Sequence, residues 1–410
     1  MTRRLDLYLN TPTLGVVQAA DVVLVEDNAS LQQVGFRYRP EYLALPQAFA
    51  IDPRQLPLAE GEKVFQCRGG APAFIDDYLP DAWGRRVLSK LALYRDGRRL
   101  NANSVIDTLS MLSHSRIGAI CLVERGEPPQ FDRGHPLSVL QAAEQAAQQI
   151  DRVDFHSIDM DEMSLLYLAN AGTGVGGARP KALFYDDAGC YVAKFNRLSH
   201  DSYNNARVEL ACLSMARTAG LDVGAGRVIT GINDREVLLL ERFDMVGPAR
   251  RHLITVNGLL KEPATQQDSG SAFRYDDICD LLRRYSGNIE RDLKQLLRLM
   301  LFNRAINNTD DHERNFSLIH DGDAWQLAPG YDLVPSLAAG AYHAAGYGYQ
   351  PNPPGPSEAA GFGRIFGLPK AVVADIAAEV RAAVNNWMCH AERAGVAEVE
   401  ARQVWQCFHL

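Results

Sequence analysis

No two cysteines in this 410-residue chain stand in the C-x-x-C spacing that zinc and redox motifs use. The cysteines are odd in number and far apart, so we expect them to be reduced and mostly buried. They are Cys67, Cys121, Cys190, Cys212, Cys279, Cys389 and Cys407. The cysteines therefore predict neither a zinc site nor a redox site.

Long apolar runs and excess positive charge are also missing. No stretch approaches the roughly 20 apolar residues that a membrane helix requires. The charged start of the chain has no apolar run behind it, so no signal peptide is predicted. The formal net charge of -8 argues against binding nucleic acid through bulk charge, and any DNA contact is expected through a partner. We therefore expect a cytoplasmic protein with no membrane association.

What the chain does have is the composition of an ordinary globular protein, with 47% hydrophobic and 22% charged residues. Its length predicts two or three sub-domains. Residues 1–125 show the alternation and turns of a β-rich part. Residues 126–245 hold a glycine-rich run among strands, and residues 246–410 carry mainly helical patterns. The predicted class is α+β, with a mostly helical C-terminal lobe.

Several elements are predicted from hydrophobic periodicity. Alternation at Leu5, Leu7 and Leu9 predicts a strand within a region of short strands and turns. Helices are predicted over residues 76–91, 137–150, 205–218 and 292–306, with a final pair over 370–387 and from about 396 to the end. Strands are predicted over residues 119–123, 182–185, 191–195, 226–230, 236–240, 316–319 and 324–327.

The most informative motif follows the helix predicted over 292–306. Asp310 and Asn315 are five positions apart, as are the base and the metal-binding Asn in the catalytic loop of protein kinases. Asp332 comes 17 residues later, at the end of a predicted hairpin, where its carboxylate can return to the same metal. A lone D-x-x-x-x-N is usually an ordinary turn. In this chain the motif follows an apolar helix and is itself followed by Asp332, and this arrangement favours phosphoryl transfer.

Two further stretches fit the same chemistry. The run over residues 172–177 contains Gly174, Val175, Gly176 and Gly177, and its main-chain N–H groups can approach phosphate oxygens. It is not a P-loop, because Lys181 is followed by Ala182, and by itself it is often a flexible loop. Lys194 lies between apolar neighbours on the next strand pair, where it can hold phosphates, and Glu209 on the following helix can pair with it. A strand-end lysine and a surface glutamate are the alternatives.

Taken together, these motifs resemble the HipA family of bacterial toxin kinases over nearly the whole chain. The most specific part is Asn308–Ser317 followed by Leu327–Asp332. The other matching stretches are 176–182, 191–194, 205–209 and 240–244, with looser matches at 35–38 and 78–81. The resemblance implies an atypical two-lobed fold similar to that of protein kinases.

The resemblance also implies roles for individual residues. Asp310 would be the catalytic carboxylate, and His312 would support its loop. Asn315 and Asp332 would bind Mg²⁺. Lys194 would hold the phosphates of ATP, with Glu241 and Phe243 at the adenine hinge. We expect Asp311, Glu313 and Arg314 to face solvent.

Family resemblance further implies a serine/threonine protein kinase that inhibits growth by phosphorylating a translation component such as an aminoacyl-tRNA synthetase. A small helix-turn-helix antitoxin of the HipB type would restrain it, with DNA contacted through that antitoxin. Many members carry an inhibitory autophosphorylation serine where this chain has Gly174, so Thr173 is the candidate replacement. A lipid or small-molecule kinase is the alternative within enzymes, and a weakly active regulatory component of an antitoxin–DNA complex is the alternative outside them.

Overall fold

The computed structural model describes residues 1–410 except 102, 113, 152–167, 169–178, 197–200, 233–234, 266–272 and 338–341. The chain divides into two compact units, each built from separate segments. Unit 1 comprises Met1–Arg197, Asp244–Ser269 and Ile319–Asp323, and unit 2 comprises Leu198–Phe243, Gly270–Leu318 and Ala324–Leu410. The three-part division at residues 125 and 245 stays a prediction.

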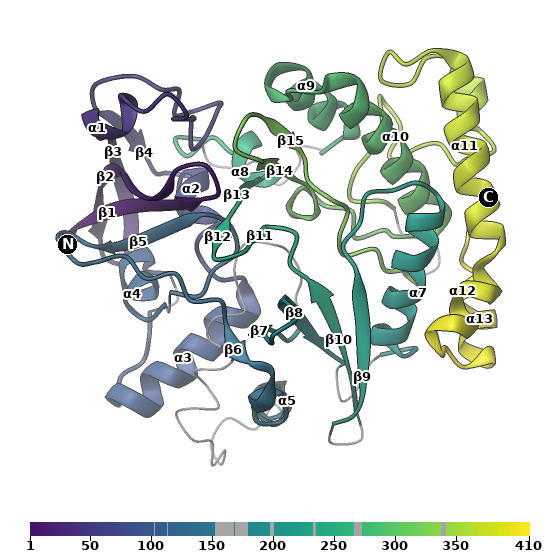
Figure 1. The fold of residues 1–410 in the computed structure, drawn as a ribbon, viewed down its shortest axis with the longest axis horizontal. Helices are drawn as coiled ribbons and strands as arrows, with labels where there is room; N and C mark the ends of the chain where they lie inside the picture. The colour runs from purple at the N-terminus through teal and green to yellow at the C-terminus, as the bar shows by residue number, and fades with distance from the viewer. Residues whose placement is uncertain are drawn as a thin grey trace. The chain divides into compact units, whose positions relative to one another are not determined.

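Unit 1 begins with a five-stranded antiparallel sheet in the order β4-β3-β2-β1-β5 (Figure 1). Leu5, Leu7 and Leu9 are buried in its first strand, which confirms the predicted alternation. Asn28 and Ala29 both have positive φ, as a tight hairpin turn requires. The strands are β1 (Thr2–Thr11), β2 (Gly15–Asp27), β3 (Ser30–Tyr38), β4 (Lys63–Gln66) and β5 (Ile120–Glu124), and the first three are longer than predicted.

The helix predicted over residues 76–91 is wrong in its bounds. The structure has two helices there, α2 (Ala73–Asp76) and α3 (Ala82–Asp96). Pro80 interrupts the helical pattern because it lacks an N–H and disfavours helix in the residue before it. The Asp81 side chain then accepts a hydrogen bond from the Gly84 N–H and caps the new helix.

The remaining elements of unit 1 include a small sheet in which β6 pairs in parallel with β7, and β7 pairs antiparallel with β8. The Asp186 side chain accepts hydrogen bonds from Ala188 N and Gly189 N in the turn between β7 and β8. Apart from β1–β5, α2 and α3, the elements of unit 1 are α1 (Pro40–Leu43), α4 (Val105–Ser110), β6 (His135–Pro136), η1 (Leu137–Val139), α5 (Leu140–Asp151), β7 (Lys181–Tyr185), β8 (Cys190–Phe195), β11 (Met245–Val246), β12 (Ala249–Arg250), β13 (His252–Thr255) and α8 (Val256–Leu260). Strands β11 to β13 were not predicted, because these short segments lie in a region that reads as helical.

Unit 2 is mostly helical. Helix α10 packs against α9 and α11, and α7 packs against α11 and α12. The apolar stripe of α10 is buried, as its 3.6-residue spacing predicts. The elements are α7 (Asn205–Thr218), the antiparallel pair β9 (Gly226–Ile232) and β10 (Arg235–Glu241), α9 (Tyr275–Tyr285), α10 (Ile289–Ala305), η2 (Glu313–Asn315), β14 (Ser317–His320, whose last two residues belong to unit 1), β15 (Trp325–Leu327), η3 (Ala359–Phe362), α11 (Lys370–Asn385), α12 (Trp387–Ala394) and α13 (Glu398–Trp405).

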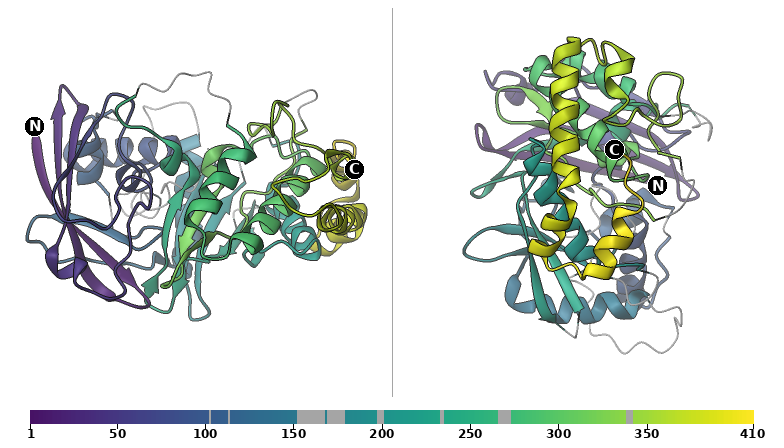
Figure 2. Two further views of the ribbon diagram at one scale, coloured as in Figure 1. Left: turned by 90° about the horizontal axis from the view of Figure 1, so that it is seen from above. Right: turned by 90° about the vertical axis from the view of Figure 1, so that its right-hand side faces the viewer.

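The end of the chain has three helices where two were predicted. Figure 2 shows α11, α12 and α13 in yellow. Asn386 separates α11 from α12, and Gly395 ends α12 with a φ of 75°. The predicted class is confirmed, with a β-rich N-terminal part and a helical C-terminal part. Within the described residues, no helix combines the length and apolarity needed to cross a membrane.

Candidate active site

Helix α10 delivers the Asp310 loop through a well-defined C-terminus. Asn307 adopts a left-handed conformation with a φ of 56°. Asn308 N donates to Asn303 O across 2.8 Å, and Asn307 N donates to Arg304 O across 3.3 Å. These two bonds form a Schellman motif, which satisfies carbonyls left over at the helix end. The core-facing helix therefore fixes where the loop begins.

Asp310 and Asn315 are joined inside this loop. The Asn315 side-chain amide donates a hydrogen bond to the main-chain carbonyl of Asp310 across 2.7 Å. Asn315 is buried, whereas the Asp310 side chain is 77% exposed. The loop thus turns the Asp310 carboxylate outward, where a substrate hydroxyl can reach it.

His312 lies next to the carboxylate of Asp310. Its Nδ1 accepts a hydrogen bond from Arg314 N across 3.2 Å, and its Nε2 lies 3.8 Å from Asp310 Oδ1. The pKa of Asp310 is raised above its ordinary value, first by desolvation and then by the negative charges of Asp332 and Asp311, while His312 opposes the shift. His312 therefore holds the loop and tunes the carboxylate.

Asp332 is attached to the same loop. It is left-handed, with a φ of 60°, a conformation that costs a non-glycine residue about 1–3 kcal/mol. The Asn308 side-chain amide donates to the Asp332 carbonyl across 3.2 Å. A second link joins Asn307 and Ser336: Ser336 N donates to Asn307 O across 2.9 Å, and the Asn307 side-chain amide donates to Ser336 O across 2.6 Å. The two loops therefore form one hydrogen-bonded assembly.

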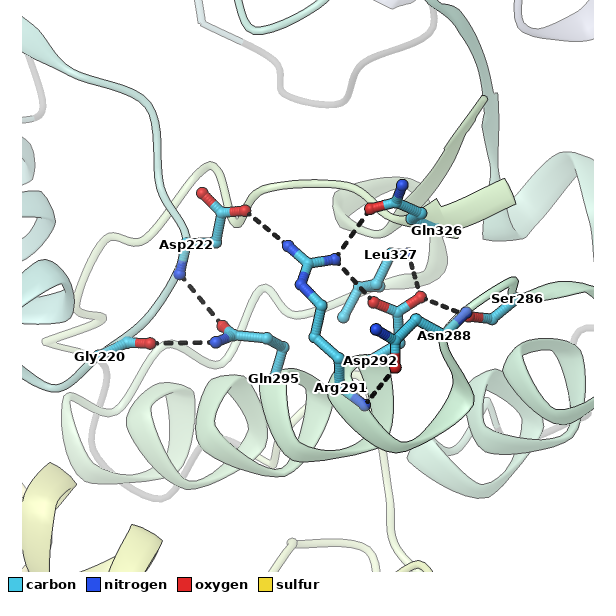
Figure 3. A network of polar contacts seen from close by, with 9 residues as sticks. All are labelled: Gly220, Asp222, Ser286, Asn288, Arg291, Asp292, Gln295, Gln326 and Leu327. Carbon is cyan, nitrogen blue, oxygen red and sulfur yellow. Dashed lines mark hydrogen bonds and ion pairs between the residues drawn. The ribbon is translucent and has the colours of Figure 1, made fainter. Parts of the chain in front are cut away.

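A buried carboxylate fixes the strand that leads to Asp332 (Figure 3). Asp292, on α10, accepts hydrogen bonds from Ser286 Oγ at 2.7 Å and from Leu327 N at 2.8 Å. Arg291 Nη1 donates to Asp292 and to Gln326. β15 is thereby tied to the helix that carries the Asp310 loop.

The same network reaches the segment between α7 and β9. Arg291 also contacts Asp222, and Gln295 bridges Gly220 O and Asp222 N (Figure 3). The carbonyl of Asp222 accepts from Gly330 N across 2.8 Å, two residues before Asp332. Each end of the stretch 327–330 is thus held through its main-chain N–H, Leu327 by the Asp292 carboxylate and Gly330 by the Asp222 carbonyl.

The residues fit a Mg²⁺ site. The Asn315 amide is oriented by its bond to Asp310, so its Oδ1 is the free end, and this buried oxygen has no hydrogen-bond partner among the described residues. An unpartnered buried oxygen beside a carboxylate loop is a suitable ligand for a hard cation. No cluster of three or more His, Cys, Asp or Glu suited to a metal occurs within the described part of the chain. Asn315 and Asp332 would be the protein ligands of the ion, and phosphate and water would supply the rest.

The predicted phosphate-binding residues are not brought together in one unit. Lys194 is half-buried on β8 in unit 1, opposite Lys181 in the strand pair, while the buried Glu209 lies on α7 in unit 2. Their pairing stays a prediction. Gly174, Val175, Gly176 and Gly177, together with Thr173, lie outside the described residues.

The two predicted hinge residues lie at the end of β10 in unit 2. Glu241 is exposed, and its main-chain N–H donates to Ala225 O across 2.8 Å. The ring of Phe243 stacks on that of Tyr331, with centroids 6.1 Å apart. Tyr331 in turn donates through its hydroxyl to Arg314 O across 3.0 Å, so Phe243 adjoins the assembly that holds Asp332.

The expectation that Asp311 faces solvent is wrong. Its side chain is fully buried and has three hydrogen-bond partners. Glu313 and Arg314 are partly exposed. No local signal marks Asp311, because all three of its partners come from residues more than 30 positions away.

Comparisons with known proteins agree with this architecture. A family model described as the HipA-like C-terminal domain matches residues 173–388, more than half of the chain, and one described as the HipA N-terminal domain matches residues 18–123. A Sinorhizobium fredii protein, Y4mE, whose name assigns it provisionally to the kinases, is 30% identical over 136 residues. The match covers 32% of each chain, so this chain spans about a third of that relative.

Solved structures give the same picture of the fold. A chain in the complex of HipA, HipB and operator DNA from the Shewanella oneidensis MR-1 toxin–antitoxin system is similar, with a TM-score of 0.68. Its identity is 17%, and the match covers 98% of this chain and 94% of that one. The kinase CtkA of Helicobacter pylori matches 57% of this chain and 87% of its own, with 13% identity and a TM-score of 0.44, too low to support an argument. On its two matched domains, the chain belongs to the HipA family.

Proposed function

We propose that this chain is an ATP- and Mg²⁺-dependent serine/threonine protein kinase that acts as the toxin of a HipA/HipB-like toxin–antitoxin system. The observation that carries the proposal is the Asp310–Asn315 bond, with the Asn315 oxygen left unpartnered beside it. A buried amide oxygen without a protein partner calls for a ligand, an ion or an ordered water. A cation bound next to the exposed Asp310 carboxylate would supply that partner.

Phosphoryl transfer depends mainly on positioning and on charge stabilisation. Asp310 orients the acceptor hydroxyl and takes its proton as the oxygen bonds to the γ-phosphorus and the bond to ADP breaks. Asn315 Oδ1 and Asp332 would hold Mg²⁺, which when bound neutralises charge on the phosphates. Lys194 and the glycines at 174–177 bind the phosphates in this proposal, while Glu241 and Phe243 line the adenine site.

The substrate and the partner are proposed by analogy with the family. The solved relative from Shewanella oneidensis is in a complex with HipB and operator DNA, which supports a HipB-like antitoxin as the partner of this chain. The net charge of -8 fits DNA contact through that antitoxin, since phosphate neutralisation needs a basic face. The proposed substrate is a protein of the translation apparatus, such as an aminoacyl-tRNA synthetase, which this toxin would modify in the cytoplasm.

To test this proposal, the wild type and Asp310→Asn are expressed in bacteria. Growth is followed, and the transfer of labelled phosphate from ATP to lysate proteins is measured. The proposal predicts arrest and labelled protein bands for the wild type only. Label entering the lipid or small-molecule fraction alone would favour the alternative kinase. Equal growth and equal labelling for the two chains would refute kinase activity.

A further inference from the structure

Asp311, in the proposed catalytic loop, is a buried carboxylate that accepts three hydrogen bonds. It accepts hydrogen bonds at Oδ2 from Tyr275 Oη across 2.9 Å and from His343 Nδ1 across 3.0 Å. At Oδ1 it accepts from Ala345 N across 3.1 Å. Asp311, Tyr275 and His343 are all buried, so each lost bond would leave a polar group without water to replace it.

This contact set continues to the loop of Asp332. Asn303 Nδ2 donates to Tyr275 Oη across 3.1 Å, and Asn308 Nδ2 donates to Asn303 Oδ1 across 3.0 Å. Asn308 Nδ2 also reaches the Asp332 carbonyl at 3.2 Å. A buried chain of hydrogen bonds therefore runs from Asp311 to the main chain of Asp332.

The segment around Ala345 is tied to the catalytic loop at a second point. Ala344 N donates to Thr309 O across 3.1 Å, directly before Asp310. Main-chain bonds thus hold the residue on one side of Asp310, and the Asp311 carboxylate holds the residue on the other. Because the chain is anchored on both sides, the main chain at Asp310 cannot turn inward without breaking these bonds.

On this geometry, we infer that Asp311 is a positioning residue for phosphoryl transfer. Its carboxylate fixes the direction of Asp310 and, through Tyr275, Asn303 and Asn308, the main chain of Asp332. The inference rests on the proposed kinase function for its catalytic consequence, but the positioning itself is a property of the loop. Asp311 touches neither nucleotide nor acceptor in this account.

The first arm of the test measures hydrogen–deuterium exchange in the purified full chain. In Asp311→Asn the single amide oxygen cannot replace both Oδ2, which accepts from Tyr275 and His343, and Oδ1, which accepts from Ala345 N. Exchange should therefore rise in peptides covering 307–316 and 343–347, with α7 unchanged. Glu26→Gln is the matched control, since this buried carboxylate of unit 1 accepts from Ser104 Oγ and Ile106 N. Unchanged exchange in both loop peptides, or an equal rise in α7, would overturn the inference.

The second arm measures labelled phosphate transfer. Asp311→Asn should lower kcat about 10- to 100-fold, as supporting residues around a metal site do, with little change in KM for ATP. Tyr275→Phe removes one of the three donors to Asp311 and the acceptor of Asn303 Nδ2. It should lower kcat less and provides a milder variant if Asp311→Asn folds poorly. An unchanged kcat would overturn the catalytic role. Absence of transfer in the wild type would instead remove the proposed function, while the exchange result still decides the positioning role.

Discussion

The side-chain amide of Asn315 donates to the main-chain carbonyl of Asp310, five residues earlier, across 2.7 Å. This bond determines which atom of the Asn315 side-chain amide remains available to bind a ligand. Its nitrogen is occupied, and its oxygen is buried without a partner among the described residues. The pair therefore gives the loop both its shape and its candidate metal ligand.

Replacing Asn315 should remove both the hydrogen bond that shapes the loop and the candidate metal ligand. We expect Asn315→Ala to lower phosphate transfer about 100-fold or more, at least as much as the loss of a residue that only supports a metal ligand. The Mg²⁺ concentration for half-maximal activity should rise. Asn385→Ala, an exposed asparagine at the end of α11, is the matched control and should behave as wild type. Equal Mg²⁺ dependence in both variants would argue against Asn315 as a ligand.

Activity should depend on the ionisation of Asp310. Its pKa is raised, so the acidic limb of kcat/KM should lie above the ordinary range of an aspartate, and transfer should increase as the pH rises through that limb. His312 lowers this pKa, so in His312→Gln the limb should move to higher pH. Solvent around the exposed carboxylate keeps the displacement small. A limb displaced to lower pH in His312→Gln would contradict the assigned electrostatics.

The Asp292 network should be a major source of stability in unit 2. Asp292→Ala leaves the buried Leu327 N–H and the Ser286 hydroxyl without their acceptor, at about 1–3 kcal/mol each. We expect urea unfolding to show a loss of about 2–5 kcal/mol. Glu290→Ala, which removes an exposed pair with Lys294 in the same helix, should leave the midpoint unchanged. Similar midpoints for the two variants would refute the role of Asp292.

Stability should fall as the pH drops from about 6.5 to 4. Burial lowers the pKa of His252, and likewise that of His320, to about 4. In this window the unfolded chain takes up protons that the folded chain cannot, so the free energy of unfolding decreases with falling pH. Asp52 opposes this between about pH 4 and 6, because burial raises its pKa to about 6.

His252→Gln keeps a donor for the carbonyl of Ile51 but cannot titrate. Its free energy of unfolding should therefore change less over this pH range than that of the wild type. Chemical denaturation at several pH values measures both slopes. Parallel slopes would show that His252 is not the titrating group.

Local patterns predicted the elements well where one face of an element repeats. The stripe of α10, the alternation in β1 and helix α7 with its Asn204 cap all have signals within a few neighbouring residues. The break at Pro80 was missed because apolar residues continue across it. Strands β11 to β13 carry too few residues for a period to be visible.

In the candidate site, too, features with a local sequence signal were predicted and features without one were missed. Spacing alone placed Asp310 and Asn315 in one loop, which the structure bears out through their hydrogen bond. The expectation that Asp311 faces solvent was wrong because its partners Tyr275 and His343 come from distant segments. No residue close to Asp311 in the sequence indicates these contacts. The sequence therefore predicts which residues share a loop better than it predicts the distant residues that hold the loop.

The most direct measurement is labelled phosphate transfer from ATP by the purified full chain in the presence of Mg²⁺. Asp310→Asn is compared with Asp280→Asn, an exposed carboxylate of α9 in the same unit. The account predicts that the wild type and Asp280→Asn transfer phosphate to protein, and that Asp310→Asn is slower by about 100- to 10,000-fold, the range for loss of a general base. Transfer by Asp310→Asn at the wild-type rate would contradict the central role of Asp310.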